Sequence, residues 1–274
     1  MSEPLRLLIL GAHPDDAEFY AGGLAAIYRS LGHVVKIISL TNGDAGHHEL
    51  SGQPLAARRA DEMRAAAGRI GAEATPWPNH DGQLEPSLDL RWQVIRELRS
   101  FAPDLVLTHR DNDYHPDHRA CGHVVRDASY LVTVPTIVPE VPILRHPPVI
   151  AYLPDRFTRP NPLRGDVVVD VGGEVDAIID MLACHASQVF EWLPFNRGIL
   201  DQVPADASAR RDWLRDWYLA YLRPQADRYR QELIATYGRE RGEKIEYAEI
   251  FEISEYAALL DANARQRLFP FVPS

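Results

Sequence analysis

The first hundred or so residues alternate short apolar runs with amphipathic stretches, and this alternation limits the fold more than any other feature. Leu5 to Leu10 is an apolar run ended by Gly11, and helical spacing of apolar residues follows from Pro14 to about Leu31. Further strand-like runs occur at Val34 to Leu40 and at Asp104 to Thr108. Repeated strand and helix units close most readily as a parallel sheet with helices on both faces. We therefore predict an α/β, Rossmann-like parallel sheet that binds its ligand at the carboxyl ends of the strands.

The connecting helices and the second half of the chain complete this expectation. Helices are predicted over Ala56 to Ile70 and over Leu88 to Phe101. A proline-rich loop region then extends to about Pro162, and a strand over Asp166 to Val171 and a helix over Val175 to Ser187 follow. No clean domain boundary is visible, so we predict a single domain with a helical C-terminal extension.

The charge and composition exclude several classes of partner. The 274 residues include 29 Lys and Arg against 39 Asp and Glu, a net charge of −10, which opposes binding to nucleic acid or to anionic membranes. The most apolar stretch, Tyr130 to Tyr152, contains several prolines together with Glu140 and Arg145, so we expect no membrane insertion. Cys121 and Cys184 are too few for a disulfide framework, and the N-terminus has no basic signal region. These features predict a cytoplasmic protein with buried, reduced thiols.

The first cluster of chemically active residues follows the first predicted strand, in the segment Ala12-His13-Pro14-Asp15-Asp16-Ala17-Glu18. A proline at the first helical position and acidic residues in the first turn are ordinary at a helix start. Capping does not explain His13. His13 and Asp16, three residues apart across the turn, can point at one centre above the sheet, and Asp15 can approach that centre from another side. The segment alone fits either a metal site or a helix cap.

A second cluster follows the predicted strand at Asp104 to Thr108, in the segment Asp113-Tyr114-His115-Pro116-Asp117-His118-Arg119. His115 and His118 are again three residues apart, with an acid between them. A lone histidine is usually a packed or surface residue, but two His/Asp clusters at equivalent positions of the fold favour a metal site. Catalytic zinc sites take three nitrogen or oxygen ligands from the protein and leave one position to water.

These two segments resemble the metal motifs of the LmbE-like (PIG-L) family of zinc-dependent N-deacetylases, which hydrolyse the acetamide of N-acetylglucosamine conjugates. The resemblance covers roughly Leu5 to Gln188, so we predict a deacetylase domain over residues 1–190 and an extension over residues 191–274 packed on it. Four other segments also resemble the family: Thr41-Asn-Gly-Asp-Ala-Gly, Arg59-Ala-Asp-Glu62, Asp81-Gly82 and His185-Ala-Ser-Gln188.

The resemblance also implies roles for individual residues. It implies three ligands for one Zn²⁺ ion per chain, with another divalent metal such as Fe²⁺ left open: His13, Asp16 and His118. Asp15 would be the general base, because a carboxylate that does not bind the metal can accept the proton of the activated water. His115, held cationic and oriented by Asp117, would donate to the developing oxyanion.

The resemblance implies less about the substrate, a small N-acetylated sugar or glycoconjugate. Arg59 is expected to bind a polar part of it, although on an alanine-rich helix Arg59 could equally be a solvated charge paired with Glu62. Tyr114 would line the pocket or merely pack. Few cations beyond Arg59 are expected at the pocket, which favours a neutral or modestly charged sugar. The loop residues His47, His48 and His80 are expected to be exposed.

The segment after Gln188 is expected either to cover the pocket or to form a homo-oligomer interface. Within it, Arg210 to Tyr237 is a long amphipathic stretch interrupted by Pro224. Its aromatic stripe is assigned to core packing or to an oligomer face rather than to a ligand site: Trp213, Trp217, Tyr218 and Tyr221.

Two other functions compete with the hydrolase. His13-Pro14-Asp15 together with a distant histidine matches the two-histidine, one-carboxylate set of non-haem iron oxygenases, but those enzymes typically build the set on an all-β barrel. A catalytically inactive sugar- or nucleotide-binding protein is the other alternative. Against nucleotide binding, the turn after the first strand lacks Gly-x-Gly-x-x-Gly, and Gly22 and Gly23 fall inside the predicted helix. Every position expected to act in catalysis holds a competent residue.

Overall fold

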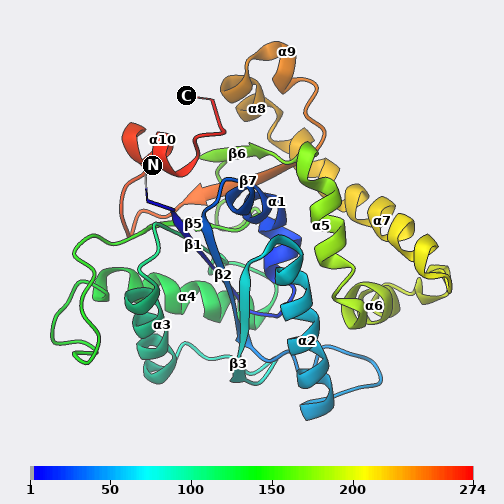
Figure 1. Cartoon of the computed structure of the whole chain (residues 1–274), viewed down its shortest axis with the longest axis horizontal. Coiled ribbons are helices and arrows are strands. Elements are labelled where there is room, and N and C mark those ends of the chain that lie inside the picture. The colour runs from blue at the N-terminus through cyan, green and yellow to red at the C-terminus, as the bar shows by residue number, and fades with distance from the viewer. Residues whose placement is uncertain (1–2, 274) are drawn as a thin grey trace.

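The first apolar run forms β1 (Arg6–Gly11), near the middle of the sheet in the computed structural model, which describes residues 3–273 (Figure 1). Seven strands lie in the order β3-β2-β1-β4-β5-β7-β6. The other strands are β2 (Val34–Thr41), β3 (Glu73–Asn79), β4 (Leu105–Thr108), β5 (Val149–Tyr152), β6 (Val167–Asp170) and β7 (Ala248–Ile253). Strands β1 to β5 pair in parallel, so their carboxyl ends share one edge of the sheet.

Alternate residues of β1 face two separate hydrophobic cores. Leu7 and Ile9 belong to one core, and Leu8 and Leu10 belong to the other. Two groups of helices cover these faces, and Figure 1 shows them on opposite sides of the sheet. One group is α1 (Asp16–Ser30), α2 (Gly52–Ile70) and α5 (Val175–Leu182), and the other is α3 (Leu88–Phe101) and α4 (Pro116–Leu131). The predicted α/β sandwich is confirmed.

The sheet is mixed rather than wholly parallel. Strand β7 comes from the C-terminal extension and pairs antiparallel with both β5 and β6. The sequence analysis missed β3, β5 and β7. Pro76 and Pro78 obscure β3, which tolerates them because it is an edge strand that pairs only with β2. Strand β5 has only four residues and directly follows Pro148, so it resembles a loop.

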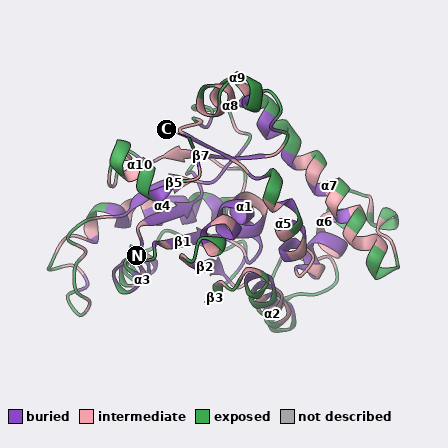
Figure 2. Ribbon diagram, turned by 45° about the horizontal axis from the view of Figure 1, so that its top comes forward, coloured by how far each residue is buried: buried purple, intermediate pink, exposed green. Residues whose placement is uncertain are grey.

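The C-terminal extension packs along the α1 and α5 side of the sheet, where its inner residues are buried (Figure 2). A π-helical turn at Ser187–Trp192 leads into its helices, and two short 3₁₀ turns lie at Gly172–Glu174 and Leu200–Gln202. The helices are α6 (Leu193–Asn196), α7 (Ala207–Arg228), α8 (Arg230–Tyr237), α9 (Arg239–Gly242) and α10 (Ala262–Leu268). Helix α7 continues through Pro224, where an interruption was predicted. Of the helices within residues 3–273, none combines the length and the apolar character that crossing a bilayer requires.

A buried carboxylate from β7 accepts hydrogen bonds from backbone amides at a kink in α1. The backbone of α1 leaves helical geometry at Ala21, and the next free amides, those of Gly23 and Leu24, donate to the two carboxylate oxygens of Glu249 at 2.7 and 2.8 Å. Gly23 permits this approach, because a Cβ there would lie 2.5 Å from a methyl group of Val171. Burial raises the pKa of Glu249 to about 8, although both amide hydrogen bonds oppose that shift.

Glu249 should make the stability of the protein depend on pH. Its pKa is higher in the folded than in the unfolded chain, so the folded state holds the extra proton and stability should fall as the pH rises from about 4.5 to about 8. One pKa unit corresponds to about 1.4 kcal/mol, so the loss is on the order of a few kcal/mol. In Glu249→Gln the free energy of unfolding should fall less between these pH values. Urea unfolding of both proteins at pH 5 and pH 8, with a chelator present, would measure the difference. An identical decline in both proteins would contradict this account.

Candidate active site

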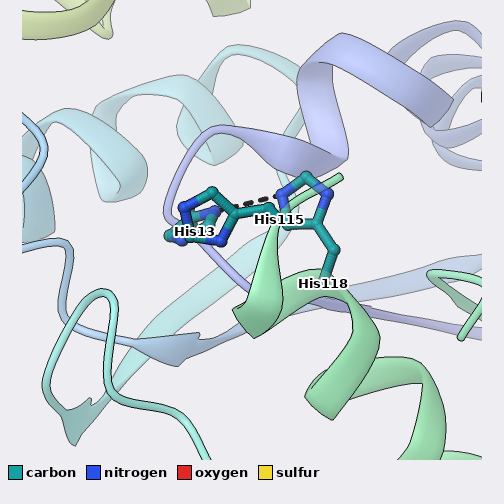
Figure 3. Close-up of side chains that lie close together, drawn as sticks. All are labelled: His13, His115 and His118. Carbon is teal, nitrogen blue, oxygen red and sulfur yellow. Dashed lines mark hydrogen bonds between the residues drawn. The ribbon is translucent and has the colours of Figure 1, made fainter. Parts of the chain in front are cut away.

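The two predicted clusters meet at the carboxyl ends of the adjacent strands β1 and β4. His13 lies in the turn that joins β1 to α1, and Asp16 is the first residue of α1. His115 is the N-cap of α4, and His118 lies in the first turn of that helix. Figure 3 shows His13, His115 and His118 converging from these segments. Local helix-start chemistry and parallel strand pairing together bring the clusters into one site.

Two histidine ring nitrogens stand at the spacing of metal ligands, and the Asp16 carboxylate lies beside both of them. His13 Nδ1 lies 3.2 Å from His118 Nε2. An oxygen of Asp16 lies 3.5 Å from His118 Nε2, and the other lies 3.7 Å from His13 Nδ1. Bonds of about 2.0–2.1 Å at tetrahedral angles place zinc ligands about 3.3 Å apart. The cluster could therefore hold a metal ion. His115 also brings a ring nitrogen within 4.8 Å of those of His13 and His118.

Asp16 is held by contacts that leave one of its oxygens free. Oδ2 accepts from the backbone amides of Ala12 and His13 at 2.8 and 2.7 Å. The same oxygen lies 2.9 Å from Nε2 of His109, which is 3 % exposed. The His109 ring also stacks on that of His118, with centroids 3.9 Å apart. The sequence analysis missed His109, although its place directly after β4 was a usable signal.

Carboxylates surround the outer nitrogens of both candidate histidine ligands. His13 Nε2 lies 3.3 Å from Asp117 and 3.3 Å from Asp81, and His118 Nδ1 lies 3.1 Å from Asp113. Burial opposes protonation of His13, but Asp117, Asp81 and Asp16 raise its pKa to about 10. Burial likewise opposes protonation of His118, but Asp16 and Asp113 raise its pKa to about 9. The negative charge that draws protons onto these rings would equally attract a divalent cation.

His115 and Asp117 are arranged differently from the prediction. The Asp117 carboxylate accepts from the amides of Gly82 and Leu84 at 2.6 and 3.1 Å and faces His13. His115 is instead oriented through its Nδ1, which accepts from the backbone amide of Asp117 at 3.2 Å. Burial, reinforced by the charges of His13 and His118, lowers the pKa of His115. Both observations favour a neutral ring with its proton on Nε2, whereas a cationic ring was predicted.

Asp15 and Arg59 form a buried pair beside the histidines. Arg59 is 2 % exposed, and it donates to Asp15 at 2.9 Å and to Asp81 at 3.4 Å. A third hydrogen bond runs to the carbonyl of Gly43 at 3.2 Å. Arg59 is therefore not the solvated surface charge that was one of its two expected roles. Its guanidinium fixes the orientation of Asp15.

These residues form the floor of a cavity of about 450 Å³. This volume lies within the range of small-molecule sites. Arg59 and Tyr114 both line the cavity, but His47, His48 and His80 do not. Of these three histidines, His80 is exposed, whereas the side chains of His47 and His48 are largely buried. Cys121 is buried as predicted, while Cys184 is only partly buried.

The segment after Gln188 contributes the far wall of the cavity. Its lining residues are Trp192, Leu193, Asn196, Arg197, Trp217 and Tyr221. The extension therefore covers the pocket, which was one of its two predicted roles. The aromatic stripe serves two purposes: Tyr218 is fully buried in the core, whereas Trp217 and Tyr221 line the cavity. The assignment of the whole stripe to core or interface is wrong, because α7 contributes Trp217 and Tyr221 to the cavity wall.

A polar network attaches this wall to α2. Arg58 pairs through two nitrogens with Glu191 at 2.6 and 2.8 Å, and His47 contacts the same carboxylate at 2.9 Å. Glu62 accepts from both the amide and the hydroxyl of Ser187 at 2.9 and 2.5 Å. The far wall is thereby fixed to the elements that hold Asp15.

The fold and the site together define a Rossmann-like α/β protein with a His/Asp cluster at the carboxyl edge of its sheet. Residues 8–129 match the family PIG-L, described as GlcNAc-PI de-N-acetylase. These residues include β1, α1 and both clusters. The chain thus carries a PIG-L (LmbE-like) family domain, as the resemblance predicted.

Curated relatives include proteins that catalyse different reactions. A 1D-myo-inositol 2-acetamido-2-deoxy-α-D-glucopyranoside deacetylase of Saccharopolyspora erythraea is 29 % identical, over 70 % of this chain and 80 % of that protein. A 4-oxalmesaconate hydratase of Pseudomonas putida is 25 % identical, over 71 % of this chain and 78 % of that protein.

Solved structures show the same fold. The N,N'-diacetylchitobiose deacetylase of Pyrococcus horikoshii superimposes with a TM-score of 0.69 at 22 % identity, covering 91 % of this chain and 83 % of that one. The 4-carboxy-2-hydroxymuconate hydratase of Pseudomonas putida gives a TM-score of 0.72 at 19 % identity, covering 94 % and 99 %. Similarity at this identity supports the fold, and function has to be argued from the site.

Proposed function

We propose that the protein is a metal-dependent N-deacetylase that hydrolyses the acetamide of an N-acetylated amino sugar. One observation carries the proposal: two histidine nitrogens at metal-ligand spacing, with the Asp16 carboxylate beside them, share a cavity with a second carboxylate, Asp15, that is fixed by Arg59. Deacetylases of N-acetylated sugars among the relatives, such as the protein of Saccharopolyspora erythraea, support the same reaction.

The donor chemistry fits a divalent transition metal. Two imidazole nitrogens and one carboxylate oxygen would hold it: His13 Nδ1, His118 Nε2 and Asp16. This set suits Zn²⁺ and also Fe²⁺, so we propose zinc without excluding iron. When bound, such an ion polarises a carbonyl oxygen and lowers the pKa of water toward neutrality. The carboxylates around the outer histidine nitrogens would fix the rings in the orientation for binding.

Asp15 and His115 would handle the protons of the reaction. Asp15 lines the cavity without belonging to the proposed ligand set, so it can accept a proton from the attacking water. Arg59 keeps Oδ1 of Asp15 engaged at 2.9 Å, which leaves the other oxygen for this task. His115 carries its proton on Nε2 and lines the same cavity, so it can donate to the oxyanion of the tetrahedral intermediate.

Substitutions at Asp15 and His13 should separate base catalysis from metal binding. Asp15→Asn should keep its metal content but lose about 10²–10⁴-fold in kcat, the usual contribution of a general base. His13→Ala should lose the metal itself. Acetate release from N-acetylglucosamine conjugates and metal analysis of the same preparation would measure both effects.

The matched control is Asp61→Asn, which makes the same chemical change at an exposed position on α2. It should behave like the unmodified protein in both measurements. Undiminished acetate release by Asp15→Asn would remove the proposed base, and full metal content in His13→Ala would remove the proposed ligand.

His109 should act as a positioning residue for Asp16. In His109→Phe the ring that stacks on His118 is retained, but the contact with Asp16 at 2.9 Å is lost. We expect metal affinity to fall about 10–100-fold, as is typical when such an outer partner is removed. Titration of the metal against a competing chelator would measure it, with His123→Phe as the control, because His123 is a partly exposed residue of α4, the helix that carries His118. Equal affinity in the two variants would show that His109 only packs.

Hydration of a carbon–carbon double bond is a second candidate, favoured by the 4-oxalmesaconate hydratase of Pseudomonas putida among the curated relatives. A metal site beside a carboxylate base could activate water for that reaction as well. Two assays of the same preparation distinguish the two functions. One measures acetate release from N-acetylated sugars, and the other measures the loss of ultraviolet absorbance when 4-oxalmesaconate is hydrated. Hydration without acetate release would replace the deacetylase proposal.

A further inference from the structure

Two arginines stack on the aromatic wall of the cavity. Trp217 and Tyr221, one helical turn apart on α7, both line the cavity. The guanidinium of Arg197 lies 4.7 Å from the ring centre of Trp217, and that of Arg156 lies 4.3 Å from the ring centre of Tyr221. Phe19, another lining residue, contacts both rings with centroid distances of 6.2 and 6.5 Å. Arg197 thus belongs to the aromatic wall of the cavity, and Arg156 lies against Tyr221 of the same wall without itself lining the cavity.

The charges of these two arginines are not neutralised by the protein. Among residues 3–273, no carboxylate lies within 4.0 Å of either guanidinium. Arg156 donates only to the carbonyl of Tyr221 at 2.7 Å, and both arginines are exposed. By contrast, the arginine at the floor of the cavity, Arg59, is paired with Asp15 and Asp81. An unpaired guanidinium stacked on an aromatic ring is already oriented and can bind an oxyanion through two parallel hydrogen bonds.

The cavity therefore differs in charge between its two ends: the groups of the floor are paired with one another, whereas Arg197 at the rim has no acidic partner within the described residues. Asp15, Asp16 and Asp81 lie at the floor, and Arg197 belongs to the rim of the same cavity. This arrangement differs from the expectation that Arg59 would be the main cation near the pocket. A substrate with its amide at the floor and a negative charge at its other end would match both ends, and would be oriented before reaction.

We propose that the substrate carries a carboxylate, remote from the scissile amide, that Arg197 binds at the rim, with Arg156 adding positive charge behind Tyr221. This inference rests on the proposed deacetylase function and specifies its substrate class. The one guanidinium that lines this end of the cavity matches the single charge of a carboxylate, whose two oxygens it can bind through parallel hydrogen bonds.

A set of glycosides that differ only in one group tests the proposal. The probes are the 4-carboxyphenyl, 4-carbamoylphenyl and 4-phosphonophenyl glycosides of N-acetylglucosamine, in both anomers. Calorimetric binding to the Asp15→Asn protein should favour the carboxylate over the carboxamide by about tenfold, the effect of one charge-assisted contact. The preference should vanish in R156Q/R197Q and shrink at 0.5 M salt. The control R239Q changes an exposed, remote arginine on α9 and should retain it.

Each outcome decides the question. Equal binding of carboxylate and carboxamide, or a preference that survives in R156Q/R197Q, would overturn the proposal. Tighter binding of the phosphonate would overturn the assignment to a carboxylate. If R156Q/R197Q still binds the carboxamide, that variant is folded. If it does not fold, the single variants R156Q and R197Q test the proposal instead. Each of them should lose part of the preference for the carboxylate. Acetate release from both glycosides without preference would support the deacetylase function but contradict carboxylate binding at the rim. Carboxylate-selective binding without acetate release would support carboxylate binding at the rim but contradict the deacetylase function.

Discussion

The carboxylate of Asp16 joins the parts of the site that come from different strands. One oxygen is held by two amides of the turn after β1 and by His109 after β4, so the turn and the neighbouring strand end are fixed together. His109 in turn stacks on His118, which α4 supplies. Helix α4 can approach this closely because Gly122 packs against the backbone of His109, where a Cβ would lie 2.3 Å from the carbonyl oxygen. The positions of His13, Asp16 and His118 therefore depend on one another.

This arrangement places several acidic groups in a small, largely dry space. Burial alone would push protons onto the carboxylates, yet contacts with His118 and His109 keep the pKa of Asp16 well below its ordinary value. Without a metal, protons on His13 and His118 balance the charge, as their raised pKa values indicate. A divalent cation could supply the same balance, because two histidine nitrogens 3.2 Å apart and the Asp16 carboxylate face one another there. The charge distribution and the spacing thus point to the same group.

The site residues were predictable from sequence only where local chemistry determines their placement. His13 and Asp16 lie three residues apart between a strand and the start of a helix, and His118 follows another strand of the same parallel sheet. These positions were enough to predict that the three residues lie close together. His109 was missed because it stands alone after β4, and its two partners come from other elements: Asp16 from α1 and His118 from α4. Strand β7 was missed because it completes the sheet from about 100 residues beyond β5, a pairing that no local pattern encodes. Trp217 and Tyr221 were assigned to core packing or to an oligomer face, because the sequence pattern of an aromatic stripe is the same whether its residues pack in a core or line a cavity.

The division of the cavity between two parts of the chain explains how related proteins can differ in what they do. Its floor, with His13, Asp15, Asp16 and His118, lies within the PIG-L domain of residues 8–129. Its rim comes from residues beyond that domain, among them Arg197 and Trp217. Deacetylases and a hydratase both occur among the similar proteins, so the shared fold does not by itself determine the reaction. If the floor activates water as proposed, the rim is the part of the cavity whose sequence can differ between relatives without changing that chemistry. The polar contacts of Glu191 and Ser187 with α2 attach the elements of this rim to the helix that carries Arg59, so the two parts of the cavity are held together by side chains of the fold itself.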